Sequence, residues 1–197
     1  MRLRPVGPHA LLAEVGDARS ALGLALWART AGLGVLEVVP AAETVLFDGV
    51  DDPDRLRERL AGWSGEPPAV SRGPVEVPVT YDGDDLDFVA DRWGTDVAGV
   101  VERHTATGFV SSFCGFAPGF AYLAGLDEQW AVPRLDTPRS RVPVGAVALA
   151  GSWCGVYPTA SPGGWRVIGR TDVALWDATR AEPALLAPGT PVRFVRA

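Results

Sequence analysis

Short apolar runs alternate with a helical pattern over the first sixty residues. Strand-length runs occupy residues 10–15, 35–39 and 44–47, and a helix is expected at 18–31. A second helix begins where Asp52 can cap the free amide groups and Pro53 occupies the first turn. Leu56, Leu60 and Trp63 then recur on one face, so this helix is expected to pack on the strands.

A turn-rich segment follows these elements. Residues 64–74 have the sequence SGEPPAVSRGP, which contains two adjacent prolines and little apolar surface to bury. This composition is typical of a linker. We therefore expect a small α+β sandwich domain at 1–66, a linker at 67–74 and a second domain at 75–197.

The second domain begins with an alternating, strand-like run at 75–81. Two amphipathic helices are expected at 86–93 and 96–104, with Thr95 available as the cap of the latter. Further strands are expected at 109–113, 146–150, 165–168, 173–176 and 192–195, separated by glycine and proline. Such spacing predicts a compact β-barrel or sandwich, and the whole chain is an α+β protein.

Composition narrows the possible functions. With 197 residues and 47% apolar content the chain can bury two cores, while its net charge of -6 opposes binding to nucleic acid or anionic membranes. No apolar run approaches a membrane span, and Met1 to Val15 lacks the features of a signal peptide. We expect a cytoplasmic protein with two reduced cysteines and no bound metal.

All 18 basic residues are arginine, and the chain contains no lysine. This absence excludes a lysine Schiff base, a pyridoxal phosphate anchor and a phosphate-loop lysine. Any anionic ligand must therefore be bound by arginine or by backbone amides.

Basic residues gather in one part of this acidic chain. Between Gln129 and Thr171 there is one acid, Asp136, against five arginines: Arg134, Arg139, Arg141, Arg166 and Arg170. Such a cluster suits a carboxylate, a phosphate or an acidic partner surface. The alternative is pairing with the acidic run Asp82, Asp84, Asp85, Asp87 and Asp91, and the sequence leaves both interpretations open.

Two other features are candidates for chemistry. His104 at a helix end could act as a base, although a helix-terminal cation that binds free carbonyls is the commoner case, and His9 is expected at the surface. Residues 161–165, SPGGW, expose backbone amides that could hold an oxyanion, but most such segments are simple hairpin turns.

Residues 115–126, GFAPGFAYLAGL, mix aromatic side chains with glycine and proline, as loops that line cavities do. Core packing is the alternative for Phe116, Phe120 and Leu123. Cys114 has no acid or histidine adjacent in sequence that would lower its pKa, so an inert thiol is expected.

Three segments together resemble one bacterial family. The patterns are GFxPGFxYLxGL at 115–126, PRxxTPRxRVPxG at 133–145 and YPxxSPGGWxxIGRT at 157–171. They are similar to the B subunit of 5-oxoprolinase (PxpB), also called allophanate hydrolase subunit 1 or KipI. The resemblance covers nearly the whole chain and implies a small α+β domain before a cyclophilin-like β-barrel.

The resemblance also implies function. It implies membership of an ATP-dependent complex that opens 5-oxoproline to glutamate, or of a related allophanate or urea-processing complex. The implied partners are a larger KipA/PxpC-type subunit and a LamB/YcsF-type PxpA subunit, with ATP bound by the partner or together with it. The alternative function within the family is inhibition of a sensor histidine kinase, whereas a free-standing prolyl isomerase is disfavoured because fold alone does not transfer activity.

Family motif positions fall on ten residues of this chain. We expect His104, Arg139 and Arg170 to be catalytic, and the substrate or anion to be bound by Tyr122, Arg134, Arg141, Ser161, Gly163, Gly164 and Trp165. The chain departs from the family at 151–155, where GSWCG replaces GGQTG. Trp153 and Cys154 are therefore expected to alter what the pocket accepts, and neither cysteine is expected to be catalytic.

Overall fold

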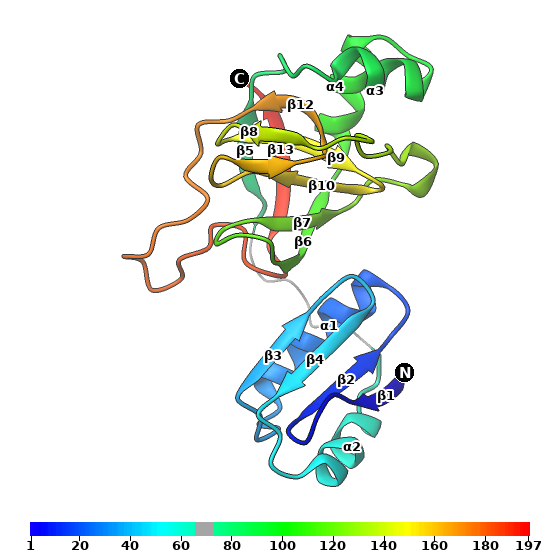
Figure 1. Cartoon of the computed structure of the whole chain (residues 1–197), viewed down its shortest axis with the longest axis vertical. Helices are drawn as coiled ribbons and strands as arrows, with labels where there is room; N and C mark the ends of the chain where they lie inside the picture. The colour runs from blue at the N-terminus through cyan, green and yellow to red at the C-terminus, as the bar shows by residue number, and fades with distance from the viewer. Residues whose placement is uncertain (66–72) are drawn as a thin grey trace. The chain divides into compact units, whose positions relative to one another are not determined.

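The computed structural model describes residues 1–65 and 73–197, which belong to two compact units, Met1–Ser71 and Arg72–Ala197 (Figure 1). Most of the linker expected at 67–74 lies outside the described residues. None of the helices within the described ranges is long and apolar enough to cross a membrane.

The first unit is a four-stranded antiparallel sheet with two helices. Its elements are β1 (Arg2–Pro5), β2 (Ala10–Glu14), α1 (Ala18–Thr30), β3 (Glu37–Pro40), β4 (Thr44–Asp48) and α2 (Pro53–Ala61). The strand order is β1-β2-β4-β3. The sequence pattern predicted all of these elements except β1, a short strand that is mostly exposed.

Both helices of this unit begin at an aspartate cap. The Asp17 carboxylate accepts a hydrogen bond from Ser20 N at 2.8 Å, and Asp52 accepts from Arg55 N at 3.0 Å, as expected for α2. The apolar faces of α1 and α2 pack with the sheet into one core, in which Leu56 and Leu60 are buried. The candidate residues of the sequence analysis all lie in the other unit.

The second unit is a nearly closed, barrel-like sheet. Its strands are β5 (Val75–Val79), β6 (Phe109–Cys114), β7 (Ala121–Ala124), β9 (Ala146–Ala150), β10 (Trp153–Val156), β12 (Arg166–Arg170) and β13 (Pro191–Arg196), in the order β12-β9-β10-β7-β6-β13-β5. Thr80 and Arg170 then exchange two backbone hydrogen bonds of 2.9 Å, which join the two outer strands. This closure confirms the α+β class with a barrel-like second half.

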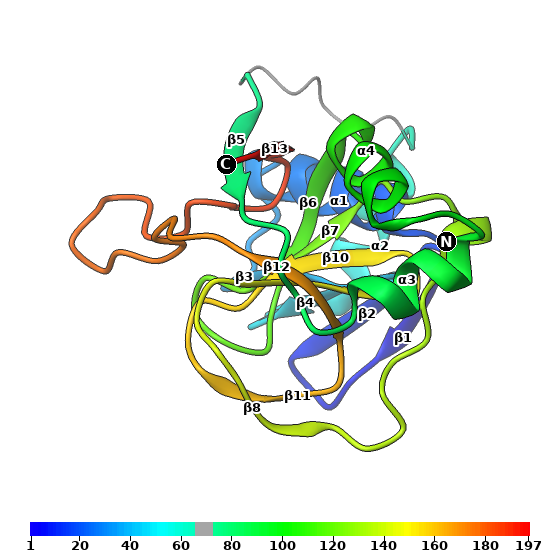
Figure 2. The ribbon, with the colours of Figure 1, turned by 90° about the horizontal axis from the view of Figure 1, so that it is seen from above.

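Two helices and a two-stranded ribbon complete the second unit. Helices α3 (Leu86–Trp93) and α4 (Val97–Ala106) pack together beside the barrel, and a 3-10 turn, η1 (Glu128–Trp130), follows β7. Strands β8 (Arg139–Val142) and β11 (Ser161–Gly163) pair only with each other (Figure 2).

The structure corrects two expectations in this unit. Helix α4 is capped by Asp96, whose carboxylate accepts from Gly99 N at 2.8 Å, and not by Thr95. No strand forms at 173–176. There the chain leaves β12 on a long excursion (Figure 2), whose two sides are joined by backbone hydrogen bonds of 3.0 Å from Asp177 N to Pro183 O and from Leu185 N to Leu175 O.

Candidate functional site

A pocket of about 420 Å³ opens in the wall of the second unit. The residues that line it are Phe116, Phe120, Tyr122, Arg134, Ala150, Gly151, Trp153, Tyr157, Pro162, Gly163 and Trp165. Six of these are aromatic, and Arg134 is the one charged residue among them. The pocket therefore combines an apolar, ring-lined interior with a single guanidinium group, an arrangement that suits a small anionic molecule with an apolar body.

Segment 115–119 forms one side of the pocket through an unusual turn. Ala117 N donates to Gly115 O at 2.8 Å around Phe116, which has a φ of 70°, a conformation that is rare for residues other than glycine. The turn leaves Phe116 62% exposed at the pocket, whereas Phe120 is 2% exposed. The expected cavity-lining loop is thus present, with Phe116 at its surface and Phe120 and Leu123 in the core.

The aromatic side chains of the pocket hold one another edge to face. Phe120 contacts Tyr122 and Trp165 with ring centroids 5.1 and 5.4 Å apart, and Tyr122 also contacts Trp153 at 6.1 Å. Such T-shaped pairs each add about 0.5–1.5 kcal/mol beyond the area that they bury. The rings therefore form a rigid wall around the space for a ligand.

Gly163 is required by the packing of Tyr157. A Cβ atom on Gly163 would overlap with the hydroxyl oxygen of Tyr157 and lie 3.0 Å from its Cζ, whereas a Cβ on Gly164 would have nothing closer than 3.6 Å. Of the two glycines in the SPGGW segment, Gly163 is the one whose missing side chain makes room for a pocket residue.

We predict that Gly163→Ala lowers the free energy of unfolding by about 1–3 kcal/mol, because the buried Tyr157 ring must move. Gly164→Ala, its matched control, is expected to change that free energy by less than about 1 kcal/mol. Denaturant unfolding of both variants measures the difference. Equal losses of unfolding free energy in the two variants would show that the Tyr157 ring does not need the space left by Gly163.

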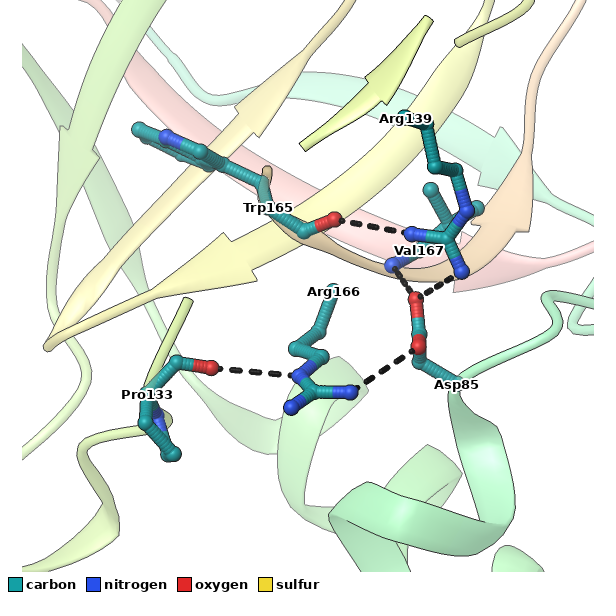
Figure 3. Close-up of polar contacts among 6 residues, drawn as sticks. All are labelled: Asp85, Pro133, Arg139, Trp165, Arg166 and Val167. Atoms are coloured by element: carbon teal, nitrogen blue, oxygen red, sulfur yellow. Dashed lines mark hydrogen bonds and ion pairs between the residues drawn. The ribbon is translucent and has the colours of Figure 1, made fainter. Parts of the chain in front are cut away.

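Next to the pocket, the buried carboxylate of Asp85 binds two arginines (Figure 3). Its Oδ2 atom accepts from Arg139 Nη2 at 2.9 Å and from Val167 N at 2.6 Å, and its Oδ1 atom lies 3.4 Å from Arg166 Nη1. Asp85 is 5% exposed and precedes helix α3 without capping it by its side chain. The carboxylate thus joins the start of α3 to β8 and β12; we call this group the Asp85 clasp.

The arginines of the clasp also hold the backbone that carries two pocket residues. Arg139 Nη1 donates to Trp165 O at 3.4 Å, and Arg166 Nε donates to Pro133 O at 3.2 Å, directly before Arg134 (Figure 3). The Arg166 guanidinium stacks on the Phe88 ring at 3.6 Å. The clasp therefore fixes both Trp165 and Arg134 from behind the pocket wall.

The arginine cluster of the sequence thus divides between its two interpretations. Arg139 and Arg166 pair with Asp85, and Arg170 Nε pairs with Asp82 at 2.8 Å on the surface. Arg134 lines the pocket, and Arg141 is exposed on β8 outside it. The ion-pair interpretation describes three of the five arginines, and the anion-binding interpretation best describes Arg134.

Of the ten residues expected at the site, the structure brings four together in the pocket: Tyr122, Arg134, Gly163 and Trp165. Two others are close by. Gly164 is buried and its carbonyl accepts a hydrogen bond from Leu135 N at 2.8 Å, while the Ser161 hydroxyl is buried on β11 without a partner among the described residues. Arg139, Arg141, Arg170 and His104 do not line the pocket.

His104 lies in the barrel core and is 0% exposed. Its Nδ1 atom is hydrogen-bonded to the Tyr81 hydroxyl at 2.7 Å, its Nε2 atom lies 3.4 Å from Cys154 Sγ, and its ring packs on Phe194 with centroids 4.5 Å apart. Burial lowers the pKa of His104 to about 3, so the ring is neutral. This position fits neither a base that meets a ligand nor a helix-terminal cation.

The buried imidazole makes stability depend on pH. Because the pKa of His104 is about 3 in the folded chain and about 6.5 when unfolded, only the unfolded chain takes up this proton between those values. We predict that the free energy of unfolding falls by up to about 1.4 kcal/mol for each pH unit below about 6. His104→Gln should remove this part of the slope in unfolding curves recorded from pH 4 to 7, and an unchanged slope would contradict the prediction.

Trp153 lines the pocket, in line with the expectation that it alters what the pocket accepts. Tyr157 also lines the pocket but was not among the expected site residues, since the sequence marks it only as the first letter of a motif. Trp153 begins β10 and Tyr157 directly follows it, so the two residues flank the buried middle of this strand. Cys154 on the same strand is fully buried, which raises its thiol pKa and fits the expected inert cysteine.

Comparison with known proteins agrees with this architecture. A family model described as "Carboxyltransferase domain, subdomain C and D" matches residues 1–186. A protein of Escherichia coli O157:H7, named as the B subunit of 5-oxoprolinase, is 42% identical over 170 residues, which cover 82% of this chain and 78% of that protein. The chain belongs to the 5-oxoprolinase B-subunit family.

Solved structures show the same fold in longer chains. The crystal structure of TTHA0988 matches with a TM-score of 0.81 and 37% identity over 96% of this chain, which spans only 40% of the TTHA0988 chain. K. lactis urea amidolyase matches with a TM-score of 0.73 over 99% of this chain and 15% of its own, and at 20% identity this likeness shows the fold alone. The fold of the 5-oxoprolinase B-subunit family therefore also occurs as one part of longer chains.

Proposed function

We propose that the chain acts as the B subunit of an ATP-dependent 5-oxoprolinase that opens 5-oxoproline to glutamate, and that the aromatic pocket binds this substrate. The observation that supports the proposal is the single guanidinium of Arg134 in a wall of aromatic rings. The substrate is a small, flat lactam ring with one carboxylate. Its ring matches the apolar interior, and its carboxylate matches the fork of an arginine.

The predicted roles of other residues change in this proposal. Arg139 acts through the Asp85 clasp as a positioning residue, since its guanidinium is bound to Asp85 and to Trp165 O. We do not retain His104 at the reacting atoms because it is sealed in the core, nor Arg170 because it is exposed and paired with Asp82. Tyr122, Gly163 and Trp165 shape the pocket.

ATP does not match the residues of this pocket. A triphosphate requires several cationic or backbone donors, whereas the pocket offers one arginine and the chain has no lysine for a phosphate loop. We infer that one of the two partners binds ATP: the larger KipA/PxpC-type subunit or the LamB/YcsF-type PxpA subunit. This chain binds and orients the lactam. We place the complex in the cytoplasm.

The direct test is reconstitution. The chain, co-expressed with its PxpA-type and PxpC-type partners, is expected to support ATP hydrolysis that depends on 5-oxoproline and to release glutamate. The same preparation without this chain is the control. Absence of both products from a complex in which all three proteins are folded and associated would reject the proposed function.

A further inference from the structure

Tyr157 is held rigidly at the floor of the pocket. It follows β10, where its N–H donates to Ala146 O at 2.9 Å and its carbonyl accepts from Gly145 N at 2.7 Å. Its ring is 2% exposed and meets Phe120 edge to face with centroids 5.5 Å apart. The side chain nevertheless lines the pocket, so its orientation is set before any ligand enters.

The hydroxyl group of Tyr157 has an unused donor. The phenol end lies against Gly163, whose missing Cβ makes room for it, and the Trp165 backbone is near enough to lower the pKa of the phenol in part. Among residues 1–65 and 73–197, no hydrogen bond donated by this hydroxyl is found, and its oxygen is not one of the fully buried polar atoms that lack a partner. Because Tyr157 lines the pocket, a ligand that enters can supply the acceptor.

The surroundings keep this donor neutral. Burial raises the pKa of Tyr157 above its usual value, although the Trp165 backbone and the charges of Arg134 and Arg139 oppose part of the increase. The pocket therefore presents two different donors, a charged guanidinium and a neutral hydroxyl. A carboxylate pairs best with the first, and an uncharged carbonyl oxygen that gains negative charge as the ring opens is matched by the second.

We propose that the Tyr157 hydroxyl donates a hydrogen bond to the ring carbonyl oxygen of the lactam and so selects lactams over other cyclic carboxylates. The inference rests on the proposed function and adds a specificity-determining residue to it. It separates the recognition of the two ends of the substrate: Arg134 binds the carboxylate, and Tyr157 binds the carbonyl.

Tyr157→Phe tests the assignment because it removes only the oxygen. Equilibrium dialysis of the complex with the PxpA-type and PxpC-type partners, without ATP, compares 5-oxoproline with cyclopentanecarboxylate, which has the ring and carboxylate but no carbonyl. We expect roughly fivefold weaker binding of 5-oxoproline and unchanged binding of cyclopentanecarboxylate, since a neutral hydrogen bond contributes about this factor. Tyr81→Phe, which removes a hydroxyl outside the pocket, is expected to leave both affinities unchanged.

Two results would overturn the assignment. Unchanged 5-oxoproline binding by Tyr157→Phe would show that the hydroxyl makes no contact with the ligand. An equal loss for both ligands would place the hydroxyl on the carboxylate. Either result leaves the proposed function standing, whereas failure of the unsubstituted complex to bind 5-oxoproline would overturn both.

Discussion

Arg134→Ala is expected to weaken 5-oxoproline binding to the assembled complex by roughly 10- to 100-fold. A hydrogen-bonded pair with a charged partner contributes about 1.5–3 kcal/mol, and Arg134 is the one charged residue among the described residues that line the pocket. The same loss should appear in kcat/KM for 5-oxoproline. Thermal unfolding should change little, because no described residue forms an ion pair with this guanidinium.

Matched substitutions distinguish the loss of the pocket guanidinium from a general change in net charge. Arg180→Ala removes one positive charge in the long excursion after β12 and is expected to leave the affinity within about twofold. Arg141→Ala tests the predicted role of an exposed neighbour in the same sequence cluster, and on the structure it should resemble Arg180→Ala. If Arg134→Ala binds 5-oxoproline as tightly as these variants do, the pocket is not the substrate site.

Asp85→Ala is expected to cause the largest loss of stability, about 3 kcal/mol. It leaves two arginines and the Val167 amide without their shared acceptor, and removing one partner of a buried pair costs about 3–5 kcal/mol. We take the lower end of this range because the side chains of Arg139 and Arg166 are 26% and 15% exposed and therefore partly solvated. Thermal unfolding followed by tryptophan fluorescence measures the effect, since five of the seven tryptophans lie in the second unit.

Asp82, which pairs with Arg170 on the surface, provides the control for the Asp85 clasp. Asp82→Ala removes the partner of Arg170 in a pair whose side chains are about half exposed, so a loss below about 1 kcal/mol is expected. If both variants lose equal stability, the Asp85 clasp is no stronger than a surface pair. If the prediction holds, Asp85→Ala should also weaken ligand binding, because Trp165 and the chain before Arg134 lose their support.

The sequence predicted those elements whose signals are local. Helix α2 was marked by its Asp52 cap, by Pro53 and by apolar residues on one face, and all of these appear in the structure. Strands β7, β8, β10 and β11 were missed because each has only three or four residues. A run of three or four residues is too short to show a clear alternation of apolar and polar positions.

The candidate site was predicted only in part, because its contacts join residues far apart in the sequence. Arg139 and Arg166 lie 54 and 81 residues from Asp85, so the sequence alone could not decide between an ion pair and an anion site. Burial of His104 depends on Phe109 and Phe194, which reach it from two other elements. The family motifs include residues that line the pocket, yet a motif does not distinguish a residue that faces a ligand from one that supports the wall.

The position of β13 has a consequence for biosynthesis. Although β13 comes last in sequence among the described strands, it lies between β6 and β5 and pairs with both, in parallel with β5. Until residues 191–196 leave the ribosome, β5 and β6 have open edges that can pair with other chains. Nascent chains should therefore expose these edges until residues 191–196 have emerged, and the barrel should close only after that point.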